Sequence, residues 1–375
     1  MKRLPEEIFN RKESLVGFSS SILKHYGVTP FHESDPRIDK LLAGHKKICV
    51  FLFDGAGKYN LSLYPRTNSF ILEHSKVTIN STNPPTTVAA TNAFLCAKWP
   101  IETGWLGWTE YIPELGFPLC VFPDTNDLTG EKVDYYHDGS HFFDKYCPLT
   151  KIDVLLRNKG INAKLEYLYP LGGEKAPKNY KDMAKKATEF FRNGGEFLYS
   201  YTPHPDHEMH TYGVKNIHVW NEFRKINKML KKFAKENPDV LVISMADHGL
   251  IDVEYTDISK HEDLLECLSG PISIEGRNCS FKIKENKKSE FERLFEQYYP
   301  SFVLLSKKDV EEMGIFGVGK KNEHYDSMMG DYLAIALGKY VLYSSKQNPK
   351  KFILKGNHAG QSKEERDINL SFYNL

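Results

Sequence analysis

Residues 48–55 read ICVFLFDG, a continuous apolar run that stops abruptly at Asp54 and Gly55. A run of this length, rich in β-branched and aromatic residues, is typical of a strand that is buried on both faces. Such strands occur in parallel sheets, because crossover helices cover both faces of those sheets. The stretch therefore predicts a central parallel strand with an acidic residue at its carboxyl end.

Two later apolar runs follow the same pattern. Residues 197–201 (FLYSY) lead to Asp206, and residues 240–245 (VLVISM) lead to Asp247. Between them, residues 215–235 carry apolar side chains at helical spacing, with lysines elsewhere. Strand, helix and strand in this order form a βαβ unit. We therefore predict an α/β fold with a mainly parallel sheet sandwiched by helices.

The segment 266–325 has a different character. Short alternating runs at 272–274 and 279–283 are typical of strands around a glycine-containing turn, and helix-like stretches follow. We interpret this segment as a small α+β insertion or cap subdomain. The rest of the chain, residues 1–265 and 326–375, then forms one large domain, because the candidate site residues come from both parts.

The composition excludes several classes of protein. The 375 residues carry 50 Lys and Arg against 49 Asp and Glu, a net charge of +1, which argues against binding to a nucleic-acid polymer or an anionic membrane. No apolar stretch approaches the roughly 18 residues that span a bilayer. The start, MKRLPEE, has Pro5 and two glutamates where a secretion signal has an apolar core, and the six cysteines lack zinc-finger spacing. We expect a cytoplasmic protein with reduced thiols; the sequence makes no prediction about its oligomeric state.

Three aspartates each follow an apolar run that we interpret as a strand: Asp54, Asp206 and Asp247. Ligands of open α/β sheets bind outside the carboxyl ends of the strands, so the three carboxylates are expected to converge there. Three histidines accompany them: His210, His248 and His358. Aspartate and histidine together are ligand types for zinc or manganese, and six such groups suffice for two neighbouring ions.

Each of these residues alone has a simpler interpretation. A strand-terminal aspartate commonly caps a turn or a helix. His204 or His207 is an alternative to His210, since all three lie in one short segment that could be a solvated loop. The conjunction of aspartates and histidines is what favours a metal site.

The segment 83–93 (NPPTTVAATNA) supplies a candidate nucleophile. It places Thr86 and Thr87 at the expected start of a helix, where free backbone N–H groups and the helix dipole favour an anion such as phosphate. Either hydroxyl could simply cap the helix, and capping is compatible with catalysis at this position.

Together these motifs resemble those of the alkaline phosphatase superfamily, in particular the type I phosphodiesterase/nucleotide pyrophosphatase family. That family has a strand ending in Asp-Gly, a Pro-x-x-Thr nucleophile motif, Pro-Asp-x-x-x-His-x-x-Gly, Asp-His-Gly and a late His flanked by glycine. This chain has the same elements in the same order: FDG at 53–55, PPTT at 84–87, PDHEMHTYG at 205–213, DHG at 247–249 and GNH at 356–358. The resemblance covers about residues 48–360 and implies an alkaline-phosphatase-like catalytic domain.

The resemblance also implies roles for individual residues. The implied ligands fall into two sets of three: Asp206, His210 and His358 for one ion, and Asp54, Asp247 and His248 for the other. The Thr87 oxygen would lie between the two ions and attack phosphorus in line, giving a phosphothreonine intermediate. The implied cofactors are two divalent ions, zinc first and manganese as the alternative.

The implied activity is hydrolysis of phosphodiester or phosphoanhydride bonds, with nucleotide-type substrates. The alternatives are a phosphomonoesterase or phosphonate hydrolase on the same metal site, and an inactive metal-binding regulator. The chain departs from the family near Trp108, where the family often has an asparagine that binds a phosphoryl oxygen. Asn92 or Lys98 is a candidate to replace that asparagine, and Trp105 and Trp108 are candidates to stack on a nucleobase. The only partner implied is a small phosphate-ester substrate.

Overall fold

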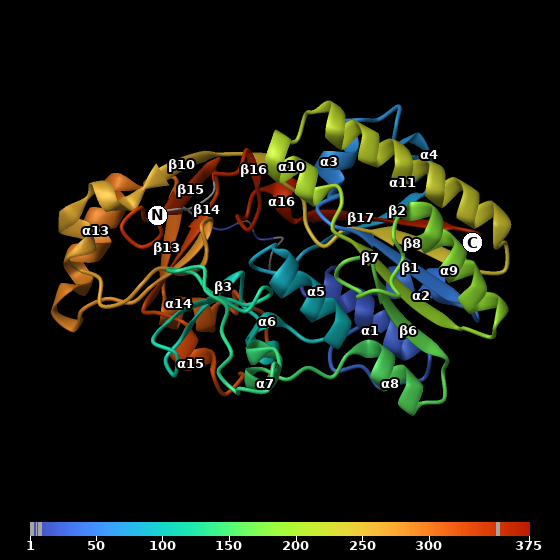
Figure 1. Ribbon diagram of the computed structural model, residues 1–375, viewed down its shortest axis with the longest axis horizontal. Helices are drawn as coiled ribbons and strands as arrows, with labels where there is room; N and C mark the ends of the chain where they lie inside the picture. The colour runs from blue at the N-terminus through green and yellow to red at the C-terminus, as the bar shows by residue number, and fades with distance from the viewer. Residues whose placement is uncertain (1–3, 5, 7–9, 350–352) are drawn as a thin grey trace.

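The computed structural model describes residues 4, 6, 10–349 and 353–375, and the structural statements below concern these residues. Most of the N-terminal segment on which the cytoplasmic prediction depends lies outside them. The described chain contains two large sheets, one at each end of the molecule in Figure 1. In this part of the chain, no helix combines the length and the apolar character needed to cross a bilayer.

The central sheet has six strands in the order β2-β17-β8-β1-β7-β6. Parallel pairs join β1 to β7 and β8, and β6 to β7, whereas β17 is antiparallel to both of its neighbours. The bounds are β1 Ile48–Phe53, β2 Ser75–Asn80, β6 Ala163–Tyr167, β7 Phe197–Thr202, β8 Leu241–Met245 and β17 Asp367–Tyr373. Every residue of β1, β7 and β8 is buried, as their continuous apolar runs predict, and the α/β fold class is confirmed.

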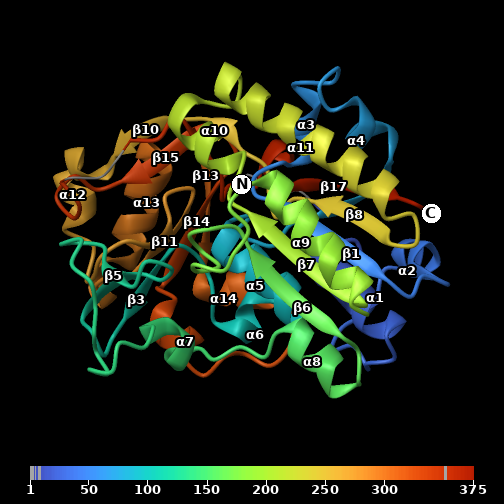
Figure 2. The ribbon, with the colours of Figure 1, turned by 45° about the vertical axis from the view of Figure 1, so that its right-hand side comes forward.

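Helices lie on both faces of this sheet (Figures 1 and 2). Helix α1 packs on α2, α5 and α8, and α11 packs on α4, α9 and α10. Their buried side chains join those of the strands in one hydrophobic core. The bounds are α1 Leu15–His25, α2 Pro36–Leu42, α3 Lys58–Ser62, α4 Ser69–Glu73, α5 Thr87–Cys96, α8 Ile152–Asn158, α9 Tyr180–Arg192, α10 Asp206–Tyr212, α11 Ile217–Glu236 and α16 Lys363–Arg366.

The second sheet has seven antiparallel strands in the order β13-β14-β12-β11-β3-β4-β5. The bounds are β3 Thr109–Ile112, β4 Phe117–Cys120, β5 Thr125–Asn126, β11 Ser273–Glu275, β12 Asn278–Phe281, β13 Phe302–Ser306 and β14 Tyr332–Ala336. Two small sheets pair β10 Glu254–Asp257 with β15 Tyr340–Tyr343, and β9 Ile251–Asp252 with β16 Gly356–Asn357. The remaining helices are α6 Pro100–Thr103, α7 Phe142–Tyr146, η2 Ile258–Lys260, α12 Glu262–Leu265, η3 Glu285–Lys287, α13 Lys288–Tyr298, α14 Lys307–Glu312 and α15 Tyr325–Met328.

Strand β14 shows that the second sheet is buried on both faces. Leu333 and Ile335 belong to one hydrophobic cluster, and Tyr332 and Ala334 belong to another, as the two-residue period of a strand requires. The predicted insertion at 266–325 supplies β11, β12 and β13, while β3, β4, β5 and β14 come from outside it. The second sheet is therefore wider than that segment, because its hydrogen-bonded ladder joins strands that lie far apart in the sequence.

Candidate active site

Asp54, Asp206 and Asp247 follow three adjacent parallel strands, β1, β7 and β8. The backbone N–H of Asp206 donates to the Asp54 carbonyl at 3.0 Å. The N–H of Gly55 donates to Oδ1 of Asp247 at 3.1 Å. These bonds join the three loops, and the carboxylates converge because their strands are neighbours in the sheet.

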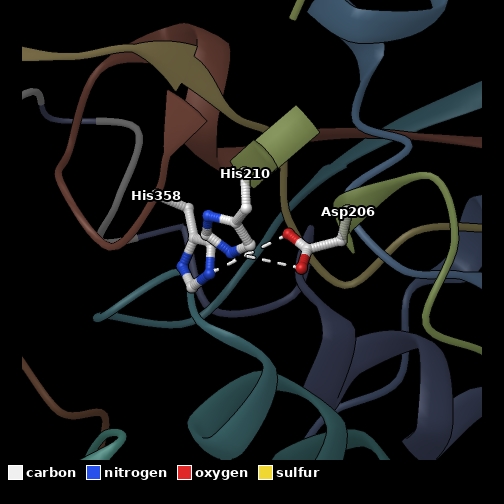
Figure 3. A group of neighbouring side chains, drawn as sticks. All are labelled: Asp206, His210 and His358. Atoms are coloured by element: carbon white, nitrogen blue, oxygen red, sulfur yellow. Dashed lines mark ion pairs between the residues drawn. The ribbon is translucent and has the colours of Figure 1, made fainter. Parts of the chain in front are cut away.

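Asp206, His210 and His358 form the first cluster of potential metal ligands (Figure 3). Their ligand atoms lie within 4.8 Å of one another. His210 Nε2 is 3.2 Å from Asp206 Oδ2, since the two residues lie one turn apart on α10, and His358 Nε2 is 4.0 Å from Asp206 Oδ1. His210 Nδ1 contacts the Gly356 carbonyl at 2.8 Å, which fixes the ring and leaves Nε2 directed at the cluster.

Asp54, Asp206 and His248 form the second cluster, again with ligand atoms within 4.8 Å of one another. His248 Nε2 lies 3.4 Å from Asp54 Oδ1 and 3.5 Å from Asp247 Oδ2. Asp206 thus belongs to both clusters, whereas the resemblance placed it in one set only. The six residues predicted as ligands lie together in one continuous site.

Burial and the proximity of like charges determine the protonation of this site. Burial, followed by the charges of Asp247 and Asp206, raises the pKa of Asp54 well above its ordinary value. Burial and the nearby His248 lower the pKa of His358. The His358 imidazole is therefore neutral at pH 7, which is the form that binds a metal ion.

The buried polar atoms of the site fit divalent cations. Within the described part of the chain, Asp206 Oδ1 and Asp247 Oδ2 are buried without a hydrogen-bond partner. Polar atoms buried in this way cost free energy, which coordination of a cation would offset. A donor set of carboxylates and imidazoles suits zinc or manganese better than magnesium or calcium.

Thr87 is the first residue of α5, and its hydroxyl reaches the second cluster. Thr87 Oγ1 lies 3.2 Å and 3.3 Å from the two carboxylate oxygens of Asp54, and 3.1 Å from His248 Nε2. Thr86 is the N-cap residue, but its hydroxyl donates to Glu275 Oε1 at 2.7 Å and makes no cap bond to the helix. Of the two threonines that the sequence motif leaves open, the geometry brings Thr87 to the potential ligands.

The two candidate substrate contacts have different surroundings. Asn92 is buried, and its side-chain amide donates to the Val88 carbonyl one turn earlier in α5, at 2.9 Å. Trp108 is 40% exposed, and its backbone N–H donates at 3.0 Å to the Glu275 oxygen that also accepts from Thr86. The structure therefore brings Trp108 close to the start of α5, while the Asn92 amide is used within its own helix.

Sequence reasoning missed two residues of the site. Glu275, at the end of β11, contacts Thr86 and the Trp108 backbone. Tyr201, in β7, donates its hydroxyl to Oδ2 of Asp54. Neither residue belongs to a recognisable motif, because Glu275 comes from the second sheet and Tyr201 lies within a continuous buried strand.

Carboxylates and imidazoles gathered around a hydroxyl, at the carboxyl edge of an α/β sheet, are typical of hydrolases that use two metal ions. The chain belongs to the Type I phosphodiesterase / nucleotide pyrophosphatase family, whose sequence profile matches residues 48–361. It is thus a hydrolase of this family with a candidate site for two metal ions. No curated protein matches the sequence.

Solved structures of ectonucleotide pyrophosphatase/phosphodiesterase 5 have a similar fold. The murine protein matches with a TM-score of 0.65 and 15% identity, over 87% of this chain and 87% of that chain. An inactive variant of the murine protein, in complex with AMP, matches with a TM-score of 0.65 and 14% identity, over 87% of this chain and 88% of that chain. The human protein matches with 0.62 and 15%, over 87% of each chain. At this identity the likeness shows a shared fold.

Proposed function

We propose that this protein hydrolyses phosphodiester or phosphoanhydride bonds of nucleotide-type small molecules, with two divalent cations and a covalent intermediate on Thr87. The observation that carries the proposal is the position of the Thr87 hydroxyl. It lies 3.2 Å from an Asp54 carboxylate oxygen and 3.1 Å from His248 Nε2, inside the cluster of potential ligands.

The site residues have separate roles in this reaction. Thr87 Oγ1 gives up its hydroxyl proton and attacks phosphorus in line. The bond from phosphorus to the leaving oxygen breaks on the opposite side, and the leaving oxygen takes up a proton. Water then cleaves the bond between phosphorus and Thr87 and regenerates the hydroxyl. Phosphoryl oxygens accept from the first N–H groups of α5, which Thr86 does not cap because its hydroxyl donates to Glu275.

Two zinc ions, with manganese as the alternative, would neutralise negative charge on the attacking and leaving oxygens. The proposed ligand sets are Asp206, His210 and His358 for one ion, and Asp54, Asp247 and His248 for the other. The neutral imidazole of His358 supports these sets, as do the buried oxygens of Asp206 and Asp247 that have no hydrogen bond among the described residues. Metal analysis of the purified protein tests the identity and number of the ions.

Two observations support a nucleotide-type substrate. Trp108 offers an exposed aromatic ring, and its backbone is bonded to the same carboxylate as Thr86. A structurally similar murine protein has been solved in complex with AMP. The segment 266–325, which supplies Glu275, is proposed to act as a cap over this site.

Hydrolysis assays on matched substrates test the proposal. The zinc-loaded protein is given nitrophenyl phosphate, bis(nitrophenyl) phosphate and a nitrophenyl nucleotide ester in parallel. Preference for the diesters is expected; preference for the monoester would replace the proposal with a phosphomonoesterase. Hydrolysis of none of them would favour the metal-binding regulator.

Variants of the nucleophile test the mechanism. Thr87→Ala is expected to abolish turnover while retaining two metal ions per chain, and Thr87→Ser, which keeps a hydroxyl, is the matched control with retained activity. Undiminished turnover by Thr87→Ala would overturn the role of Thr87. The cytoplasmic location is proposed from the sequence alone, and cell fractionation tests it.

A further inference from the structure

A fully buried ion pair, Arg277 with Glu365, joins the second sheet to the central one. Nε and Nη2 of Arg277 each lie 2.7 Å from a Glu365 carboxylate oxygen, and both side chains have no exposed surface. Arg277 lies in the turn between β11 and β12, whereas Glu365 lies in α16 next to β17. Arg277 also donates to the carbonyls of Gly338 and Tyr340, at 2.7 Å and 2.9 Å.

Such a pair adds little to stability. Removing two charges from water offsets most of their mutual attraction, so apolar residues of the same size often replace a buried ion pair without loss of stability. A two-pronged contact between Arg277 and Glu365 does, however, fix the position of the carboxylate.

The Glu365 carboxylate holds the loop that carries His358. Its Oε1 accepts the backbone N–H of Gly360 at 2.8 Å, two residues after His358. The loop approaches the ion pair so closely that a Cβ on Gly360 would lie 2.5 Å from Arg277 Nη2. The Glu365 backbone carbonyl also accepts the N–H of Gly249, at 2.7 Å, directly after His248.

The residue after Arg277 provides a second link to the same loop. Nδ2 of Asn278 donates to the Ala359 carbonyl at 3.2 Å and to Asn83 Oδ1 at 2.9 Å. The N–H of Ala359 donates in turn to the Pro85 carbonyl at 3.0 Å. The start of β12 is therefore tied to both the His358 loop and the loop that precedes Thr87.

We propose that Arg277 and Glu365 are positioning residues for the metal ligand His358, and that the second sheet thereby helps to assemble the metal site. This inference rests on the proposed function, since it takes His358 to be a ligand. The Glu365 carboxylate accepts the Gly360 N–H, and Arg277 holds that carboxylate in place. Mutation of a residue that orients a metal ligand, without itself binding the metal, typically lowers metal affinity by about 10- to 100-fold.

Two double variants separate positioning from stability. Arg277→Met with Glu365→Met removes both charges and the acceptor for the Gly360 N–H. Arg277→Met with Glu365→Gln removes the same charges but keeps an acceptor oxygen at residue 365. Zinc is titrated calorimetrically into the metal-free full chain of each variant, and thermal unfolding is measured in parallel.

The Met/Met variant is expected to bind one of its two zinc ions at least about tenfold more weakly than the wild type, while the other ion binds as before. The Met/Gln variant keeps an acceptor for the Gly360 N–H but loses the guanidinium that holds it, so its affinity for the same ion is expected to fall by less than that of the Met/Met variant. Wild-type affinity for both ions in the Met/Met variant would overturn the inference. Wild-type protein that binds no zinc would instead overturn the proposed function.

Two single variants keep the test decisive if the Met/Met protein does not fold. Arg277→Lys keeps the buried positive charge but loses the two-pronged contact, and its affinity for one zinc ion is expected to fall by about tenfold. Leu294→Ala, in the separate hydrophobic cluster around α13, is the control that lowers stability alone. Unchanged zinc binding in Arg277→Lys, or an equal loss in Leu294→Ala, would contradict positioning by the ion pair.

Discussion

Replacement of Asp247 by asparagine separates the metal-binding role of this residue from its role in folding. Oδ1 of Asp247 accepts the N–H groups of Gly55 and His248, at 3.1 Å and 3.0 Å. Oδ2 is buried without a hydrogen bond within the described residues and lies 3.5 Å from His248 Nε2. Asparagine has the same shape as aspartate and keeps an Oδ1 acceptor. Asp247→Asn therefore removes only the negative charge and replaces Oδ2 by an amide nitrogen.

Without metal, the variant is expected to be more stable than the wild type. Burial is the largest cause that raises the pKa of Asp247, so its charged form destabilises the folded state at pH 7. We therefore expect a higher free energy of unfolding for the variant than for the wild type in the absence of metal. The gain should vanish below about pH 4, where the carboxyl group is neutral in both the folded and unfolded states, and grow as the pH rises.

With zinc, the order of stability is expected to reverse. At a free zinc concentration 100 times its Kd, one bound ion stabilises the folded state by about 2.7 kcal/mol. Loss of one ion would remove this stabilisation from the variant and leave it less stable than the wild type under these conditions. Urea unfolding at pH 7, in chelator and at fixed free zinc, measures both differences. Equal stabilisation of both proteins by zinc, or a variant less stable in chelator, would refute the reasoning.

Further predictions concern metal removal and three residues of the site. Chelation is expected to stop hydrolysis, and added zinc or manganese to restore it; sustained turnover in chelator would contradict the metal requirement. Tyr201→Phe removes the donor to Asp54 and should weaken zinc binding by about tenfold in a calorimetric titration, and unchanged binding would show that this bond does not orient the ligand. Trp108→Ala should raise KM for a nucleotide ester by about tenfold with little change in kcat, since stacking on a base is worth about 1–3 kcal/mol. Asn92→Ala is the control and should leave KM unchanged, because the Asn92 amide donates to a carbonyl within α5. A larger rise in KM for Asn92→Ala than for Trp108→Ala would show that Asn92, and not Trp108, contacts the substrate.

The part of the fold that carries the site could be predicted from three apolar runs. The runs at 48–53, 197–201 and 240–245 correspond closely to β1, β7 and β8, and the helical pattern at 215–235 corresponds to α11. Strands buried on both faces have continuous apolar sequences, so their type and ends are marked locally. Because three such strands are neighbours, the aspartates after them meet, and motif order could place all six potential ligands at one site.

The second sheet could be predicted only in part. Strands β3, β4 and β5 lie about 150 residues before β11 in the sequence, and their pairing depends on tertiary contacts rather than on local pattern. For the same reason Glu275 and Arg277 carry no sequence signal for their contacts with Thr86 and Glu365. The bounds of the insertion at 266–325 and the cytoplasmic location stay predictions.

A covalent adduct on Thr87 is the most direct test of the proposed mechanism. The zinc-loaded protein is mixed with a nitrophenyl nucleotide ester, quenched in acid within the first turnover and digested for mass spectrometry. The mechanism predicts a phosphoryl-linked nucleotide on the peptide that contains Thr87. Hydrolysis that proceeds with an adduct on another residue, or with no adduct on Thr87 at any time during the first turnover, would contradict it.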